Sequence, residues 1–245
     1  MAGGSVTYRG IILQSREYKE KDRLIKLLTG DSGLIDICVK GTGKLGSNNA
    51  YASVPYMLCD IVAAESHGYK YLRSGSIIES NSAILTNLDT ITSAAHIADI
   101  LIDMSGQSDN CREAYELAVY SYYHLANHTD RWKLITAAFN WRALTVMGFT
   151  VEYSVTNDTA SQVSDRDLYC LSCTGGEIYS GKRNGDQYMM MSGVAIKALN
   201  YIASCPIDKL YGIEASEGLS DTLFDFTIKY LSYQLEKDYK GRFII

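Results

Sequence analysis

Residues 8–44, YRGIILQSREYKEKDRLIKLLTGDSGLIDICVKGTGK, decide the fold of the N-terminal part. Short apolar segments at 10–15, 23–29 and 34–40 alternate with charged or glycine-rich turns, a pattern typical of β-strands. Two further segments, 56–64 and 69–74, have the same character. Five short antiparallel strands favour a small closed barrel, because an open sheet would leave long edges unpaired.

The pattern changes after residue 80, where apolar residues recur at three- and four-residue steps. Helices are expected at 92–104, from about 109 to 127, at 131–147, from 192 to 203, and at 220–237. Ser192 is a predicted N-cap and Gly148 a predicted C-cap. The sequence thus predicts an α+β protein, with a barrel over 1–80, a helical domain over 81–245, and a turn-rich, cysteine-containing insertion at 151–188.

Charge is divided unevenly along the 245 residues, whose net charge is −5. Residues 1–80 contain ten Lys/Arg and eight Asp/Glu, whereas the remainder contains thirteen and twenty. The acidity therefore belongs to the C-terminal part. The whole chain does not have the bulk positive charge of a nucleic-acid coat protein, but a basic face on the barrel is still compatible with its sequence.

The cations near the barrel turns are the candidate nucleic-acid ligands, because phosphates require several positive charges on one face. The alternative is a solvated hairpin whose cations are neutralised by Glu17, Glu20 and Asp22. The candidates are Arg16, Lys19, Lys21, Arg23, Lys26, Lys40 and Lys44.

Cys170 and Cys173 have half of the ligand spacing of a zinc ribbon. A structural zinc takes four ligands, and no second CxxC pair exists; His128 precedes the helix at 131–147. A redox CxxC begins a helix after a strand, whereas this pair leads into Thr174 and two glycines. An incomplete or lost zinc site is the preferred interpretation.

Catalytic patterns are missing from the sequence. The four histidines lack HExxH spacing, and neither a GxSxG elbow nor a GxxxxGK[ST] loop occurs. A non-enzymatic protein is therefore expected. The N-terminus shows no signal peptide, and no apolar run is long enough to span a membrane. Six scattered cysteines without an export signal favour reduced thiols and a cytoplasmic protein.

Several short motifs, in order, resemble the RecO family of bacterial recombination mediators. Near the N-terminus these are Gly10-Ile11-Ile12-Leu13 with Arg16, Lys21-Asp22-Arg23-Leu24, Leu27-Leu28-Thr29, Gly33 and Val39-Lys40-Gly41. Later matches are Ile78-Glu79-Ser80, Arg142-Ala143-Leu144 with Gly148-Phe149, Met191-Ser192-Gly193, and residues 231–244. The resemblance extends over nearly the whole chain, and it is carried by order and spacing rather than by any single motif.

This resemblance implies an OB-fold domain that binds single- and double-stranded DNA, followed by a helical domain with a zinc-ribbon-like insertion. It implies a DNA repair and recombination protein that anneals complementary strands without ATP. The implied partners are RecR and single-stranded-DNA-binding protein (SSB), with which the family loads recombinase onto coated single strands. The implied location is the bacterial cytoplasm, in association with the nucleoid. The alternative is an adaptor whose OB-fold binds protein and has little affinity for DNA.

Two features depart from the family pattern. Many members have two cysteine pairs that form a zinc site, whereas this chain has only Cys170 and Cys173. The loop at 41–49 contains fewer arginines and lysines than many relatives have. Fewer cations displace fewer counterions, so a shallower salt dependence of DNA binding is expected.

Overall fold

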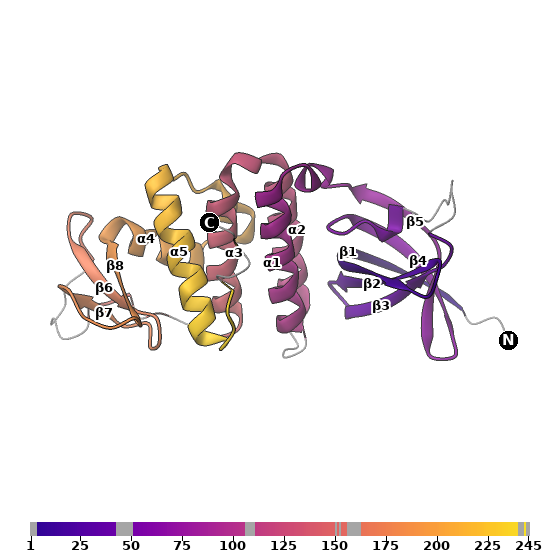
Figure 1. Cartoon of the computed structure of the whole chain (residues 1–245), viewed down its shortest axis with the longest axis horizontal. Helices are drawn as coiled ribbons and strands as arrows, with labels where there is room; N and C mark the ends of the chain where they lie inside the picture. Colours follow the sequence, from indigo (N-terminus) through magenta and orange to yellow (C-terminus); the bar gives the residue numbers. More distant parts are fainter. Residues whose placement is uncertain are drawn as a thin grey trace. The chain divides into compact units, whose positions relative to one another are not determined.

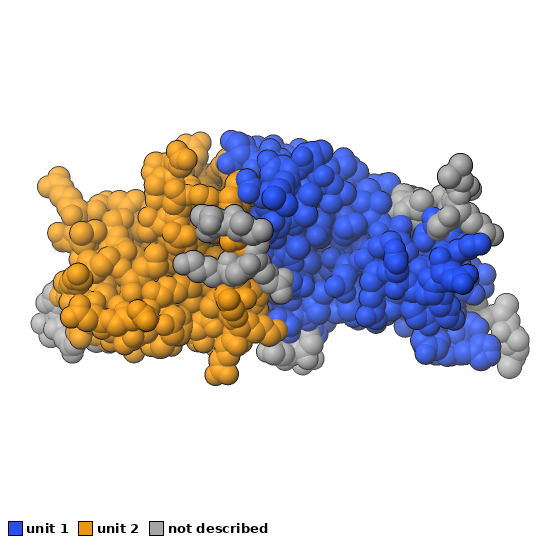
Figure 2. Space-filling view, viewed as in Figure 1, with its two compact units in different colours: residues 1–130 blue, residues 131–245 orange. Residues whose placement is uncertain are grey.

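The chain forms two compact units, residues 1–130 and 131–245, in a computed structural model (Figures 1 and 2). The structure describes residues 4–42, 51–105, 111–149, 151, 153–155, 163–239 and 243. The predicted change of domain near residue 80 coincides with the change from strands to helices. The first compact unit nevertheless extends beyond it and includes two helices.

A five-stranded closed barrel begins the first unit (Figure 1). The strand order is β1-β2-β3-β5-β4; β3 and β5 are parallel, and the other pairs are antiparallel. The strands are β1 (Ser5–Tyr18), β2 (Asp22–Thr29), β3 (Gly33–Val39), β4 (Leu58–Ser66) and β5 (Tyr69–Glu79). The five strands expected from the sequence are therefore present, and they close into the expected barrel.

Alternation along the strands fills the barrel interior with apolar side chains. Ile25 and Leu27 of β2 face inward and are fully buried. Ile37 of β3 and Ile61 of β4 meet them in the same core cluster. The intervening residues of β2 and β3 face outward, so alternation also determines which polar side chains reach the outer surface.

Two helices, α1 (Leu88–Ser105) and α2 (Cys111–Asn127), complete the first unit. Short 3₁₀ turns, η1 (Tyr51–Ser53) and η2 (Ser82–Thr86), precede them. Tyr122 of α2 stacks on Tyr56 at 5.1 Å between ring centroids. Gly33, with φ of +63°, lies so close to Cys111 that an added Cβ would be 2.8 Å from its Sγ. These contacts attach α2 to the barrel.

The second unit is built on α3 (Trp132–Val146), α4 (Gly193–Ser204) and α5 (Glu217–Gln234), with a short 3₁₀ helix η4 (Ile207–Gly212) between the last two. Trp141 of α3 lies 5.6 Å from Phe226 and 5.1 Å from Tyr230 of α5, measured between ring centroids. Arg142 donates from Nε to the Ile202 carbonyl at 2.9 Å, and its Nη2 also bonds Cys205. Arg142 therefore satisfies carbonyls at the C-terminal end of α4.

A three-stranded sheet, β6 (Leu168–Ser172), β7 (Ile178–Ser180) and β8 (Tyr188–Ser192), lies within the second unit in the order β7-β6-β8. The sequence predicted only turns here, because the strands are short and separated by glycine-rich segments. Ser192 caps α4 as predicted, accepting from the Ala195 N–H at 3.2 Å. The last helix begins at Glu217 and ends at Gln234, three residues earlier at each end than expected.

Candidate nucleic-acid interface

The outer face of the barrel carries a continuous row of side chains across four strands. Arg16 of β1 pairs with Leu24 of β2, Leu24 pairs with Cys38 of β3, and Cys38 pairs with Tyr71 of β5. Because directly paired residues share one face of a sheet, the row has a cation at one end, an aromatic ring at the other, and apolar side chains between.

Arg16 lies within β1, which continues to Tyr18, and not in the turn where the sequence placed it. The strand can extend because Arg16, Glu17 and Tyr18 all pair with β2. Its side chain is exposed and on the same face as Leu24. The longer strand thus fixes the position of the Arg16 backbone.

A groove of about 360 Å³ opens on this face. Leu24, Leu34 and Cys38 contribute apolar walls, and Asp36 contributes a carboxylate. Residues 68–70, at the β4–β5 turn and the start of β5, form one side of the groove. OB-type barrels bind oligonucleotides at this position, on strands 2 and 3 between the loops that follow strands 1 and 4.

A larger pocket, of about 490 Å³, lies in the second unit. Residues of α5 and Met189 line it. It contains Asp225 and Asp238 beside Lys229, so its charge does not favour a polyanion. The groove on the barrel is therefore the better candidate for nucleic acid.

The β1–β2 turn is held against the segment that follows β3. The Asp22 carboxylate accepts from the Gly41 N–H at 2.9 Å, and Thr42 Oγ1 donates to the Lys21 carbonyl at 3.4 Å. Asp22 is therefore engaged in fixing the turn. Lys19 in this turn and Lys40 after β3 are brought to the same end of the barrel.

Asp22, Lys19 and Lys40 are close enough to the Cys38 thiol to affect its pKa. Burial raises its pKa, and Asp22 raises it further, whereas Lys40 and Lys19 oppose both effects. Two lysines from separate segments thus act on one side chain of the outer row. Lys40 also lies over the Tyr71 ring, with Nζ 4.4 Å from its centroid.

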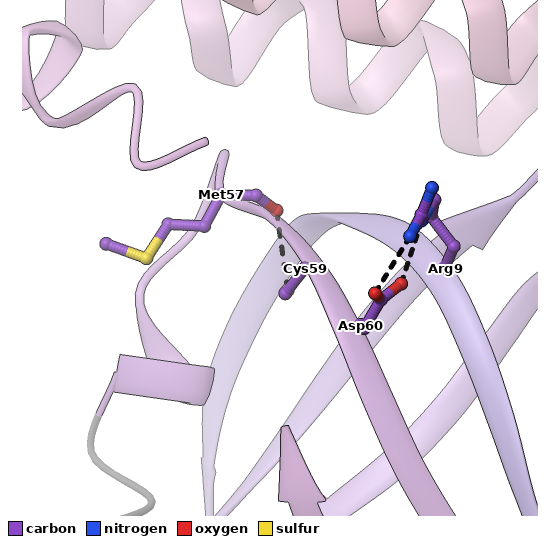
Figure 3. Close-up of polar contacts among 4 residues, drawn as sticks. All are labelled: Arg9, Met57, Cys59 and Asp60. Carbon is purple, nitrogen blue, oxygen red and sulfur yellow. Dashed lines mark hydrogen bonds and ion pairs between the residues drawn. The ribbon is translucent and has the colours of Figure 1, made fainter. Parts of the chain in front are cut away.

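Three other cations of the barrel have polar partners. Figure 3 shows Arg9 and Asp60 pointing toward each other from β1 and β4, joined by contacts of 2.8 and 2.9 Å. This pairing raises the pKa of Arg9 and lowers that of Asp60, chiefly through the hydrogen bond between them. Lys26 contacts Asp36 at 3.0 Å, and Arg23 donates to Ser15 Oγ at 2.8 Å.

The remaining predicted cations are more available to a ligand. Arg16, Lys19, Lys21 and Lys40 are exposed, and within the described ranges none of them forms an ion pair. In the described part of this turn, Glu17, Glu20 and Asp22 form none of the ion pairs with these cations that the alternative of a neutralised hairpin would require. Lys44 lies outside the described residues.

Sequence reasoning missed Tyr69 and Lys70 at the start of β5. Tyr69 is 60% exposed, and both residues line the groove. The signal was present in the sequence: an aromatic residue and a cation directly follow the tight turn at 66–68. It was overlooked because the cations nearest the N-terminus are more numerous.

In the part of the chain that the structure describes, the cysteine pair has no further side chains that would complete a zinc site. Cys170 and Cys173 are buried, and burial raises the pKa of the Cys173 thiol to about 11. Among the described residues, no three His, Cys, Asp or Glu side chains are grouped so as to hold a metal ion. The zinc-ribbon-like insertion stays a sequence-based expectation.

The loop after β6 is instead attached to α5 by hydrogen bonds. Gln234 donates from Nε2 to the carbonyls of Cys173 and Thr174, at 3.0 and 2.9 Å. Lys229 contacts the Tyr188 carbonyl at 3.4 Å. Protein contacts thus hold the three-stranded sheet to the helices of the second unit. No helix in the described ranges combines the length and apolar character needed to cross a membrane.

Comparison with known families identifies the chain. Residues 1–81 match the family profile described as Recombination protein O N terminal, and residues 85–243 match Recombination protein O C terminal. The chain belongs to the RecO family. The resemblance inferred from the sequence motifs is thereby confirmed, and the protein is a RecO-family DNA repair protein.

Curated RecO relatives match along most of their length. The chain is 28% identical to DNA repair protein RecO of Acetivibrio thermocellus over 231 residues, which cover 94% of this chain and 92% of the relative. It is 20% identical to that of Clostridium acetobutylicum over 229 residues, with the same two shares. It is 21% identical to that of Caldicellulosiruptor bescii over 232 residues, covering 95% and 94%.

Proposed function

We propose that this RecO-family chain is a non-enzymatic mediator that binds single- and double-stranded DNA through the outer face of its barrel. The observation that carries the proposal is the set of exposed cations, none of them in an ion pair within the described residues, on the barrel face whose residues Leu24 and Cys38 line the groove. The strand order and the parallel β3–β5 pair support assignment of the barrel as an OB-fold.

The groove offers both kinds of contact that single strands use. Tyr69 is exposed and lines the groove, so it provides a ring on which a base can stack. Arg16 and Lys40 provide charge for phosphates at either side of the apolar row. The contacts do not read sequence, which suits a protein that pairs any two complementary strands.

Strand annealing follows from electrostatics in this proposal. Two single strands repel each other through their phosphates, and bound cations reduce that repulsion until complementary bases meet. No covalent step is involved, so no catalytic group is required. The family relationship supports RecR and SSB as partners during recombinase loading, with the acidic residues after 80 as the protein-docking part.

The test is an annealing assay on bare complementary oligonucleotides with full-length protein. The wild type should accelerate annealing, and the triple variant Arg16→Ala, Lys21→Ala, Lys40→Ala should lose most of that acceleration. The control triple Arg112→Ala, Arg166→Ala, Lys209→Ala changes the net charge equally, at exposed cations distant in sequence from the barrel strands.

Two results would contradict the proposal. Wild-type protein that leaves the annealing rate unchanged would favour the adaptor alternative, in which the barrel binds protein. Equal losses in the two triple variants would mean that net charge, and not the barrel face, produces the effect. The melting temperature of each variant, measured in parallel, excludes unfolding as the cause.

A further inference from the structure

The loop between β7 and β8 is a second basic feature, located in the otherwise acidic C-terminal part. It contains Lys182 and Arg183, and residues 181–186 are all exposed. Gly181 and Gly185 have φ of +81° and +126°, values that let the loop turn sharply on both sides of the two cations. The cations are therefore presented at a tight, exposed turn.

Arg183 makes a cation–π contact with the Tyr179 ring. Its guanidinium carbon is 3.7 Å from the centroid of the Tyr179 ring. The Tyr179 ring in turn meets Tyr188 edge-on, with centroids 6.2 Å apart. Contact with the ring restricts the Arg183 side chain, which is nevertheless exposed to solvent.

The strands below the loop extend this surface. Cys170 pairs with Tyr179 on one side and with Met190 on the other, so the three residues share one face of the sheet. Cys170 is buried within that row, whereas Met190 is 38% exposed. This face thus combines the Arg183 guanidinium, packed on Tyr179, with the apolar side chains of Cys170 and Met190.

Neither cation of the loop forms an ion pair within the described residues, although the loop also contains exposed Asp186. By contrast, Lys197 and Lys133 of the same unit contact Asp165 and Asp221 at 2.7 Å each. The charges of Lys182 and Arg183 complement a polyanion. The Arg183 guanidinium, packed on the Tyr179 ring, is suited to stacking with a base.

We propose that this face is a second contact for single-stranded DNA, in which one base stacks on the exposed Arg183 guanidinium and Lys182 binds a neighbouring phosphate. Bases stack on arginine planes as well as on aromatic rings in single-strand recognition. The proposal rests on the proposed function only in naming DNA as the ligand. A chain with contacts in both units can hold two segments of single strand, which annealing requires.

The test measures binding of the full-length protein to a fluorescein-labelled oligo(dT) by anisotropy. Arg183→Ala should weaken binding about fivefold or more, since that is the lower end of what one stacked base contributes. Arg183→Lys keeps the charge but loses the plane, so it should also weaken binding. Lys209→Ala, which removes one exposed cation from the same unit, should have a smaller effect.

An abasic oligonucleotide of the same length separates stacking from charge. On this ligand, Arg183→Lys should bind as tightly as the wild type, because no base is present to stack. A loss equal to that on oligo(dT) would overturn the stacking contact. Arg183→Ala indistinguishable from Lys209→Ala on oligo(dT) would overturn the second site altogether.

These outcomes are independent of the barrel. If the triple variant Arg16→Ala, Lys21→Ala, Lys40→Ala binds DNA normally while Arg183→Ala does not, the barrel site fails and the second contact stands. The opposite pattern retains the barrel site and removes the second contact. Arg183 is exposed, so its variants should keep the wild-type melting temperature.

Discussion

At the scale of single residues, hydrogen-bond partners separate the cations into two groups. Arg23 and Arg16 are close in sequence, yet Arg23 is bonded to Ser15 whereas Arg16 is exposed on the outer row. The sequence predicted that cations gather here, because strand and turn patterns are local. It did not predict which cations are paired, since Asp36 and Asp60 reach their partners only through strand pairing.

Buried thiols make the stability of the protein sensitive to alkaline pH. Burial raises the pKa of Cys173 from its ordinary value of 9.0 to about 11, and that of Cys59 to about 12. The neutral thiol is favoured in the folded state, so this contribution is complete below pH 9 and is lost as pH rises through the folded-state values. We expect the unfolding free energy from urea titrations to fall between about pH 9 and 11.

Cys173→Ala provides the matching control for that pH dependence. The variant should be less stable at pH 7 because a packed side chain is shortened, but its stability should fall less steeply between about pH 9 and 11. Identical slopes for the variant and the wild type would show that Cys173 does not contribute.

At the scale of elements, the β2–β3 turn determines how α2 meets the barrel. Gly33→Ala should destabilise the protein in two ways: by about 1–2 kcal/mol for a side chain in the left-handed region, and by the clash with Cys111 Sγ. Gly68→Ala is the matched control, because Gly68 also has positive φ but nothing within 4 Å of an added Cβ. A larger loss in melting temperature for Gly33→Ala is expected; equal losses would mean that the contact with Cys111 does not matter.

The three-stranded sheet is the element that the sequence revealed least. Its strands are three to five residues long, too short for alternation to stand out from the surrounding turns. The barrel and the helices were predictable because their apolar patterns are longer. The start of the last helix was misplaced because Ser216, which caps it by accepting from the Leu219 N–H, was overlooked as a cap.

Metal analysis tests whether hydrogen bonds alone hold this sheet. We expect less than one zinc per chain by elemental analysis, and an unchanged melting temperature after chelation, because Gln234 already anchors the Cys173–Thr174 carbonyls. A full equivalent of zinc that is lost in Cys170→Ser would contradict this. Gln234→Ala should lower stability by about 1–2 kcal/mol, whereas Gln14→Ala, at an exposed site, should not.

At the scale of the whole molecule, acidic and basic residues are distributed unevenly between the barrel and the rest of the chain. The excess of acidic residues follows residue 80, while the barrel has exposed cations and a groove lined by Tyr69 and Lys70 among mainly apolar side chains. Family membership explains why a chain with net charge −5 acts in DNA repair. Sequence motifs were sufficient for the family and for the general position of the basic turns. The groove itself required the fold, because β3 and β5 meet only when the barrel closes.

The most direct test of DNA contact by the barrel is the salt dependence of single-strand affinity. Each phosphate contact contributes about −0.7 to the slope of log affinity against log salt concentration for single strands. The variant Arg16→Ala, Lys21→Ala, Lys40→Ala should therefore bind more weakly than the wild type, with a slope shallower by about 2. A slope and affinity equal to those of the wild type would contradict the account.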